Sequence, residues 1–573
     1  MRLLYLLFII NWISFAHATP ILVDPQDRFS PTLAKQGMVV ASESFAAQAS
    51  LEVLKQGGNA VDAAVTLGFA MAVTAPRAGN LGGGGFMLVY DAETQKVVAI
   101  DYREKAPALA HKDMYLDQNG DVDAVRSKFT HLAAGVPGTV AGLALALEKY
   151  GTISLQQALQ PAIQLATDGF PMPATLANAI QDATERFQRS AASRAIFMKP
   201  DGSFYQAGEL FKQADLAKTL RLLAEQGTDA FYHGKIADQI VAEMQANQGI
   251  ISKTDLANYQ PQIRQPIQGN YRGYDVFSMS PPSSGGVHIV QMLNMLEQFD
   301  IKQTGHNSAQ TIHIMTEAMK RAYADRSQYL GDTDFVSVPL QGLTHKDYAK
   351  QLTQQFDLQK ATLSQNIREG QPAVYESPET THYSIVDKHG NAVANTYTLN
   401  FSFGSGITVS GAGFLLNNEM DDFSAKPNVP NAYGLIGGTA NAIEPHKRML
   451  SSMSPTIVLK DNKPFLVTGS PGGSRIITAV LQVILNVIDH DMNIQEAVNA
   501  ARIHHQWLPD KIFMENGLSP DTVDLLKQKG HRLEASRTMG ATNSILIQHT
   551  DDNKRILNGA ADPRRPEAIV ASY

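Results

Sequence analysis

The feature that most constrains the fold is a predicted β-hairpin between residues 381 and 399. Within 381–386 (Thr-His-Tyr-Ser-Ile-Val), every second residue belongs to the same face: Thr, Tyr and Ile alternate with His, Ser and Val. This is the period of a β-strand. Residues 387–391 (Asp-Lys-His-Gly-Asn) have turn chemistry, and 392–399 form the return strand. With the turn centred near His389, Thr398 returns opposite Thr380. Two threonines then face each other at the entry to the first strand.

A threonine at this position has a possible chemical role. If the Thr380 hydroxyl attacks the carbonyl of Glu379, the peptide bond becomes an ester, and water then releases Thr380 as a new N-terminus. Its α-amine, with a reference pKa of about 7.7–8.0, would serve as base for its own hydroxyl. The same residues also suit the start of an ordinary β-strand, so this stretch alone leaves both interpretations open.

The N-terminus and the composition limit the classes of protein. Residues 1–18 resemble a cleavable secretory signal peptide, with Arg2, an apolar run and an Ala-His-Ala cleavage site. We therefore expect export, to a periplasm or outside the cell, without a stable membrane anchor. The net charge of −7 and the lack of a basic block argue against nucleic acid as a partner. The absence of cysteine excludes disulfides and a thiol nucleophile.

Several motifs invite functional interpretations that their spacing does not support. The glycine run at 82–85 lacks the Gly-Lys-Ser/Thr of a phosphate loop. The acidic stretch 419–422 lacks calcium-loop spacing, and the His504–His505 pair lacks a third metal ligand. By contrast, the glycines of Gly472–Gly473, just before a predicted helix, offer consecutive N–H groups of the kind that stabilise an oxyanion.

Taken together, these motifs resemble the γ-glutamyltransferase (γ-glutamyl transpeptidase) family. The resemblance extends from about Ala41 to Tyr573. It rests on motifs that occur in the family's order, namely Thr380-Thr381-His382-Tyr383-Ser384, Asp422, Ser451-Ser452 and Gly472-Gly473. It implies the four-layer αββα sandwich of N-terminal-nucleophile hydrolases and self-cleavage between Glu379 and Thr380. After the signal peptide, a large subunit (19–379) and a small subunit (380–573) would form one globular heterodimer.

The resemblance also implies a role for each site residue. Thr380 would be the nucleophile, assisted by Thr398, and Gly472 and Gly473 would form the oxyanion hole. Tyr433 would belong to a loop (425–442) that covers the substrate. The residues implied in binding the γ-glutamyl group are Arg103 for its α-carboxylate, Asn400, Glu419 and Asp422 for its α-ammonium, and Ser451 and Ser452 as further hydrogen-bonding groups. Family members carry glutamine or glutamate at the position of Glu419, which leaves the charge balance of this pocket open.

The expected activity is transfer of a γ-glutamyl group from glutathione or a related compound to water, an amino acid or a peptide. No metal or organic cofactor is implied. A related acylase that cleaves glutaryl or cephalosporin amides is one alternative, although its substrate lacks the α-ammonium that the acidic residues would bind. An unprocessed, inactive homologue that serves as a binding protein is another, and the intact Thr380, Thr398 and Gly472–Gly473 argue against it.

Overall fold

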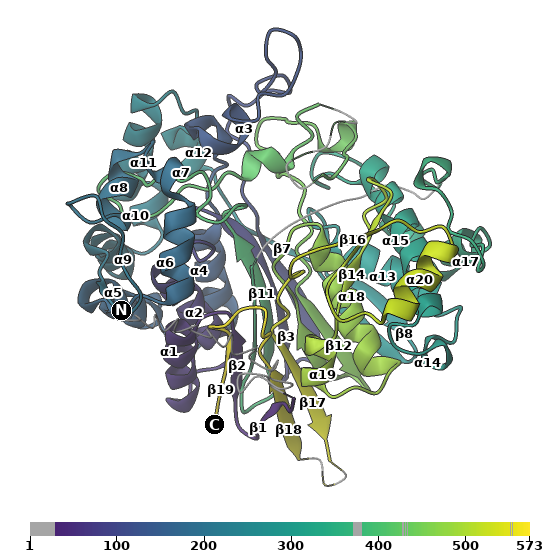
Figure 1. Cartoon of the computed structure of the whole chain (residues 1–573). Coiled ribbons are helices and arrows are strands. Elements are labelled where there is room, and N and C mark those ends of the chain that lie inside the picture. Colours follow the sequence, from purple (N-terminus) through teal and green to yellow (C-terminus); the bar gives the residue numbers. More distant parts are fainter. Residues whose placement is uncertain are drawn as a thin grey trace, which may run out of the picture.

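The computed structural model describes residues 29–370, 381–426, 429, 431, 434–550, 552 and 554–573. Two seven-stranded antiparallel sheets lie face to face between two groups of helices (Figure 1). The order in the first sheet is β19 (Ile569–Ser572), β2 (Met38–Ala41), β10 (Thr381–Val386), β11 (Ala392–Thr398), β3 (Gly84–Asp91), β4 (Lys96–Tyr102) and β7 (Gln262–Arg264). The order in the second is β1 (Thr32–Ala34), β18 (Arg555–Ala560), β17 (Ser544–His549), β13 (Lys463–Thr468), β12 (Thr456–Lys460), β9 (Tyr274–Ser278) and β8 (Ile267–Tyr271).

One helical layer covers the outer face of each sheet (Figure 1). The helices beside the first sheet are α1 (Ser44–Lys55), α2 (Ala60–Thr74), α4 (Thr139–Tyr150), α5 (Leu155–Asp168) and α9 (Ala214–Gln226). Those beside the second are α13 (Gly285–Leu296), α15 (Ala309–Tyr329), α18 (Arg475–Ile488) and α19 (Ile494–Asn499). The predicted αββα sandwich is therefore confirmed.

Shorter elements surround these four layers. On the side of the first sheet they are α3 (Arg126–Phe129), α6 (Ala174–Asp182), α7 (Thr184–Phe187), α8 (Ala191–Phe197), α10 (Asp229–Tyr232), α11 (Lys235–Ala246), α12 (Lys253–Ala257) and the pair β5 (Phe170–Pro171) and β6 (Leu210–Phe211). On the other side they are α14 (Ile301–Thr304), α16 (Leu340–Leu343), α17 (Lys346–Thr353), α20 (Pro520–Gln528) and a small sheet of β14 (Ile503–His504), β15 (Ile512–Met514) and β16 (Leu533–Ala535).

The predicted hairpin forms the middle of the first sheet. β10 pairs antiparallel with β11, and Thr381 lies opposite Tyr397. The turn is closed by the Asp387 carboxylate, which accepts hydrogen bonds from the N–H groups of His389, Gly390 and Asn391. Because side chains alternate along β10, Tyr383 and Ile385 pack into the core beneath the helices, whereas Val386 packs between the sheets. The hairpin is thus fixed from both faces.

Polar side chains on the other face of β10 are also satisfied. The ring of His382 pairs with the hydroxyls of Thr396 and Ser384, each at 2.9 Å, and Ser384 donates to the carbonyl of Asn543. Burial lowers the pKa of His382 to about 3, so the ring is neutral at physiological pH. This network joins the start of β10 to the segment before β17 in the opposite sheet.

Wherever the structure describes the chain, no helix is both long and apolar enough to cross a bilayer. The predicted signal peptide (1–18), the Glu379–Thr380 cleavage site and Tyr433 lie outside the described residues.

Candidate active site

The site begins where β11 ends. Thr398 is the last residue of β11; its hydroxyl oxygen accepts a hydrogen bond from the Asn400 N–H at 2.7 Å, and its carbonyl accepts one from the Asn80 side chain at 2.8 Å. The register in which Thr381 faces Tyr397 is the one that the predicted pairing of Thr380 with Thr398 requires. Thr380 itself lies outside the described residues, so that pairing stays a prediction.

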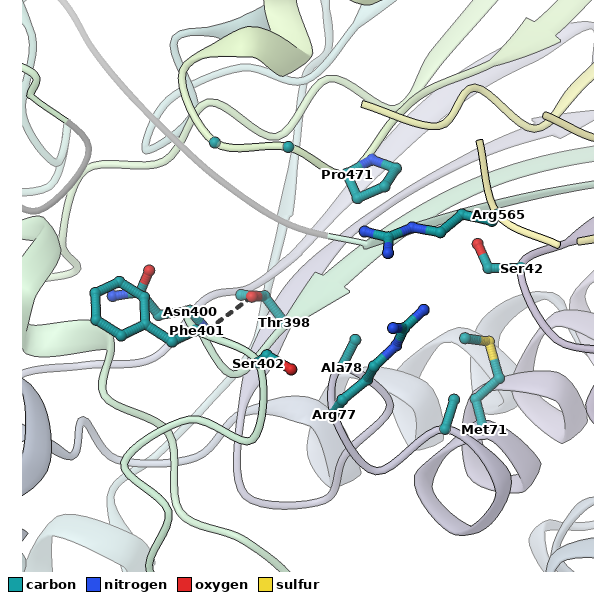
Figure 2. A pocket seen from close by; sticks show the side chains of 13 residues that line it. Ser42, Met71, Arg77, Ala78, Thr398, Asn400, Phe401, Ser402, Pro471 and Arg565 are labelled. Atoms are coloured by element: carbon teal, nitrogen blue, oxygen red, sulfur yellow. Dashed lines mark hydrogen bonds between the residues drawn. The ribbon is translucent and has the colours of Figure 1, made fainter. Parts of the chain in front are cut away.

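A cavity of about 280 Å³ opens beside Thr398 (Figure 2). It brings four of the predicted site residues together: Thr398, Asn400, Gly472 and Gly473. Other segments complete its lining, namely Ser42, Met71, Ala75, Arg77, Ala78, Phe401, Ser402, Pro471 and Arg565. The cavity is therefore built from both sheets and from the helical layer of the first.

Gly472 and Gly473 have a backbone that favours glycine. Their φ values are 133° and 70°, and a Cβ atom on Gly472 would lie 3.0 Å from the Cα of Gly540. Ser470 ties the same two loops together, because its hydroxyl accepts a hydrogen bond from the N–H of Ala541 at 3.0 Å. Within the described part of the chain, neither glycine N–H donates a hydrogen bond. Two fixed donors before α18 remain available for a developing negative charge.

A second, fully buried cluster centres on Arg103, directly after β4. Its guanidinium contacts Glu419 Oε1 at 2.5 Å and Asp422 Oδ2 at 2.6 Å. It also donates to the carbonyls of Met449 and Leu450, each at 3.3 Å. The predicted Ser451 and Ser452 follow in the chain and are buried as well. The five predicted residues of this cluster thus come from three separate segments.

Local hydrogen bonds hold the acidic segment in place. The 3-10 helix η3 (Glu419–Asp422) follows Asn417, whose side chain accepts from the Glu419 N–H and donates to the carbonyls of Gly82 and Gly135. The side chain of Asn400 donates to the carbonyl of Asn418 at 2.9 Å. Asn400 therefore links the buried cluster to Thr398 and to the open cavity.

The cluster contains more carboxyl groups than cationic groups. Burial raises the pKa of Glu419 and of Asp422 well above the ordinary range, and the charge of Arg103 opposes that shift without cancelling it. Glu104 lies 3.6 Å from the Arg103 guanidinium, and burial raises its pKa to about 7. One arginine thus faces three carboxyl groups.

Several oxygens in this cluster lack hydrogen-bond partners among the described residues. They are Glu419 Oε2, Asp422 Oδ1, both carboxyl oxygens of Glu104 and the hydroxyl of Ser452. Buried polar atoms without partners are costly, so a group of them is the pattern expected where water or a polar ligand binds. The cluster has the chemistry to hold a small molecule with both a cationic and an anionic group.

Three residues of these sites were missed by the sequence analysis. Glu104 was detectable, because it follows Arg103 directly in the sequence. Arg77 and Arg565 have no local motif that marks them.

The His504–His505 pair, considered above for metal binding, has protein partners instead. His504 hydrogen-bonds to Thr478 and Gln506, and His505 hydrogen-bonds to Asp510.

Two face-to-face antiparallel sheets between two helical layers define the fold of N-terminal-nucleophile hydrolases. The Gamma-glutamyltranspeptidase family profile matches residues 46–572. The chain therefore belongs to the γ-glutamyltranspeptidase family.

Individual relatives agree with this assignment. The Glutathione hydrolase proenzyme of Escherichia coli (strain K12) is 56% identical over 549 residues, which cover 96% of this chain and 94% of the relative. A cephalosporin acylase from Bacillus halodurans superposes with a TM-score of 0.84 at 28% identity, covering 96% of this chain and 99% of its own. A Helicobacter pylori gamma-glutamyltranspeptidase chain superposes with a TM-score of 0.58 at 47% identity, covering 59% of this chain and 96% of its own.

Proposed function

We propose that this protein is a self-cleaving γ-glutamyltransferase. It takes the γ-glutamyl group from glutathione or another γ-glutamyl compound and passes it to water, an amino acid or a peptide. The observation that carries the proposal is the buried Arg103 cluster. Its guanidinium matches an α-carboxylate, and the unpartnered oxygens of Glu419 and Asp422 match an α-ammonium. Family membership and the name of the Escherichia coli relative support the same activity.

The precursor would first cleave itself. The Thr380 hydroxyl attacks the carbonyl carbon of Glu379, the C–N bond breaks, and the resulting ester is hydrolysed by water. The products are a large subunit (19–379, after loss of the signal peptide) and a small subunit (380–573), which stay together because both sheets contain strands from each part. The word "proenzyme" in the relative's name, and the Helicobacter chain that matches 59% of this one, support such processing. Export through residues 1–18 belongs to the same proposal.

The mature enzyme would use Thr380 in two half-reactions. Its hydroxyl attacks the γ-carbonyl carbon while its α-amine takes the proton and then passes it to the leaving amine. Gly472 and Gly473 donate to the oxyanion, Arg103 and Ser451–Ser452 hold the α-carboxylate, and the acidic residues with Asn400 hold the α-ammonium. Water or an amine then attacks the γ-glutamyl ester and restores the Thr380 hydroxyl. Tyr433 would shield the bound substrate.

An acylase for glutaryl or cephalosporin amides is a second candidate, because the cephalosporin acylase has the same fold. A glutaryl group has no α-ammonium. It would leave the buried Glu419 Oε2 and Asp422 Oδ1 without a hydrogen-bond donor, which is unfavourable.

The discriminating experiment compares γ-glutamyl-p-nitroanilide with glutaryl-p-nitroanilide, which differ only in the α-ammonium group. We expect kcat/KM to be at least about 100-fold higher for the γ-glutamyl compound, as one or two buried charge-assisted hydrogen bonds imply. Equal rates would favour the acylase. An enzyme inactive on both would favour the unprocessed binding homologue.

A further inference from the structure

Two arginines face each other across the open cavity, apart from the Arg103 cluster. Arg77 follows α2 and Arg565 lies in the loop between β18 and β19. Figure 2 shows their guanidinium groups pointing toward one another beside Thr398, with Pro471 above them. Both line the cavity that also contains Gly472 and Gly473. The pair is therefore next to the predicted oxyanion donors.

Neither guanidinium has an ion-pair or hydrogen-bond partner among the described residues. Other half-buried or buried arginines are paired: Arg264 contacts Asp101 at 2.7 Å, and Arg502 contacts Asp562 at 2.7 Å. The acidic residue that acts on both Arg77 and Arg565 is Glu567, and its carboxylate accepts a hydrogen bond from Thr175. Glu567 and, for Arg565, Asp562 offset part of the positive charge, but neither carboxylate pairs directly with either guanidinium.

The electrostatics agree with that geometry. The pKa of Arg77 falls to about 10, first because of burial and then because of the charge of Arg565. Burial also lowers the pKa of Arg565. Two like charges in a partly buried place repel one another, and an anion between them removes the repulsion.

Both arginines stand on fixed backbone. The carbonyl of Arg77 accepts a hydrogen bond from Phe403 at 2.9 Å. The N–H of Arg565 donates to the carbonyl of Asp562, whose carboxylate is held by Arg502. Anchored arginines bind a carboxylate with little loss of backbone freedom.

The position of the pair identifies the part of the substrate that it meets. The acyl half of a γ-glutamyl amide would occupy the buried Arg103 cluster, which Asn400 links to the cavity. The amine half lies on the other side of the scissile bond and must leave through an open space. By microscopic reversibility, an acceptor amine enters where the first amine left.

We propose that Arg77 and Arg565 form a binding subsite for the free carboxylate of the amine half, both in the leaving peptide and in the acceptor. This inference rests on the proposed γ-glutamyltransferase function. It assigns to this chain a preference for peptide-like leaving groups and acceptors that end in a carboxylate.

The test compares glutathione with its C-terminal glycinamide, which has the same γ-glutamyl group and lacks the terminal charge. The variants are Arg77→Gln and Arg565→Gln, with Arg221→Gln as the matched control, because Arg221 is an exposed arginine on α9. Release of the γ-glutamyl group is followed as kcat/KM for each compound at low and at physiological salt.

We expect the unmodified enzyme and the Arg221→Gln control to prefer the free acid by about tenfold, the size of one charge-assisted contact. Each cavity variant should lower kcat/KM for the acid several-fold more than for the amide, and the preference should shrink at higher salt. An acid preference that survives in both variants, or an equal loss for acid and amide, would overturn the subsite. Inactivity of the unmodified enzyme on both compounds would instead refute the proposed function.

Discussion

The Arg103 guanidinium contacts the Asp422 carboxylate at 2.6 Å, although the two residues are 319 positions apart in the chain. This contact joins the end of β4 to η3 and is completely buried. Asp422 uses one oxygen for Arg103, and its other oxygen has no partner among the described residues. The pair therefore orders the arginine and at the same time keeps an acceptor available for a ligand cation.

Replacing that acceptor should weaken substrate recognition. We expect Asp422→Asn to lower kcat/KM for γ-glutamyl-p-nitroanilide by about 10- to 100-fold, mainly through KM, because a charge-assisted hydrogen bond contributes about 1.5–3 kcal/mol. Steady-state kinetics measure the effect. Glu419→Gln is the matched comparison and should lose less than about tenfold, because glutamine suits the same position in the resembled family. A larger loss for Glu419→Gln than for Asp422→Asn would contradict these assignments.

Glu104 should make the stability of the protein depend on pH. Its pKa is about 7 in the folded protein and about 4.5 in the unfolded chain. The stabilisation from the protonated carboxyl is complete below about pH 4.5 and is lost as the pH rises through about 7. Glu104→Gln removes that loss. The difference in free energy of unfolding, variant minus unmodified protein, should therefore increase from pH 5 to pH 8, by at most about 3 kcal/mol.

Urea unfolding of both proteins at the two pH values measures this difference. Glu148→Gln is the control, because the Glu148 side chain is 69% exposed and should give the same difference at both pH values. If Glu104→Gln also gave a pH-independent difference, the carboxyl would not be protonated in the folded cluster.

An alanine at Gly472 should impair the chemical step. Its φ of 133° is unfavourable for alanine, and the new Cβ would press on Gly540. We expect kcat to fall by about 10²–10³ because the N–H group moves away from the oxyanion position. Gly57→Ala is the control, since Gly57 has a φ of 100° and free space for a Cβ. It should cost about 1 kcal/mol of stability and keep kcat. Normal turnover by a folded Gly472→Ala enzyme would exclude this oxyanion hole.

Thr398 should affect self-cleavage through its hydroxyl. Valine has a similar shape but cannot accept the hydrogen bond from the Asn400 N–H. We expect Thr398→Val to slow the appearance of two chains roughly tenfold, since the lost hydrogen bond from this part-buried N–H contributes about 0.5–1.5 kcal/mol. A time course on denaturing gels gives the rate. Thr398→Ser should process much faster than Thr398→Val, and equal rates for the two would assign the effect to packing alone.

The sequence predicted the elements with local signals well. The alternation in 381–386 gave the correct strand, and the turn residues gave the register that sets Thr381 opposite Tyr397. The boundary between α1 and α2 likewise carries local signals, in Gly57–Gly58 and the Asn59 cap of α2. These features depend on neighbouring residues, so a single sequence is enough to find them.

Contacts between distant segments were beyond such reasoning. The pattern of β10 does not reveal that β2 becomes its second neighbour, because that pairing depends on the whole sandwich. The roles of Arg103, Glu419 and Asp422 came from the family resemblance, and their direct ion pairs appeared only in the structure. Arg77 and Arg565 meet because a C-terminal loop folds over the cavity, and nothing local in either segment indicates it.

The most direct test of the account is the intact mass of the purified protein under denaturing conditions, with N-terminal sequencing of the shorter chain. We predict two chains, the shorter beginning at Thr380, and a single uncleaved chain for Thr380→Ala. A single chain in the unmodified protein, or a cut at another bond, would contradict the assignment of Thr380 as a self-processing nucleophile.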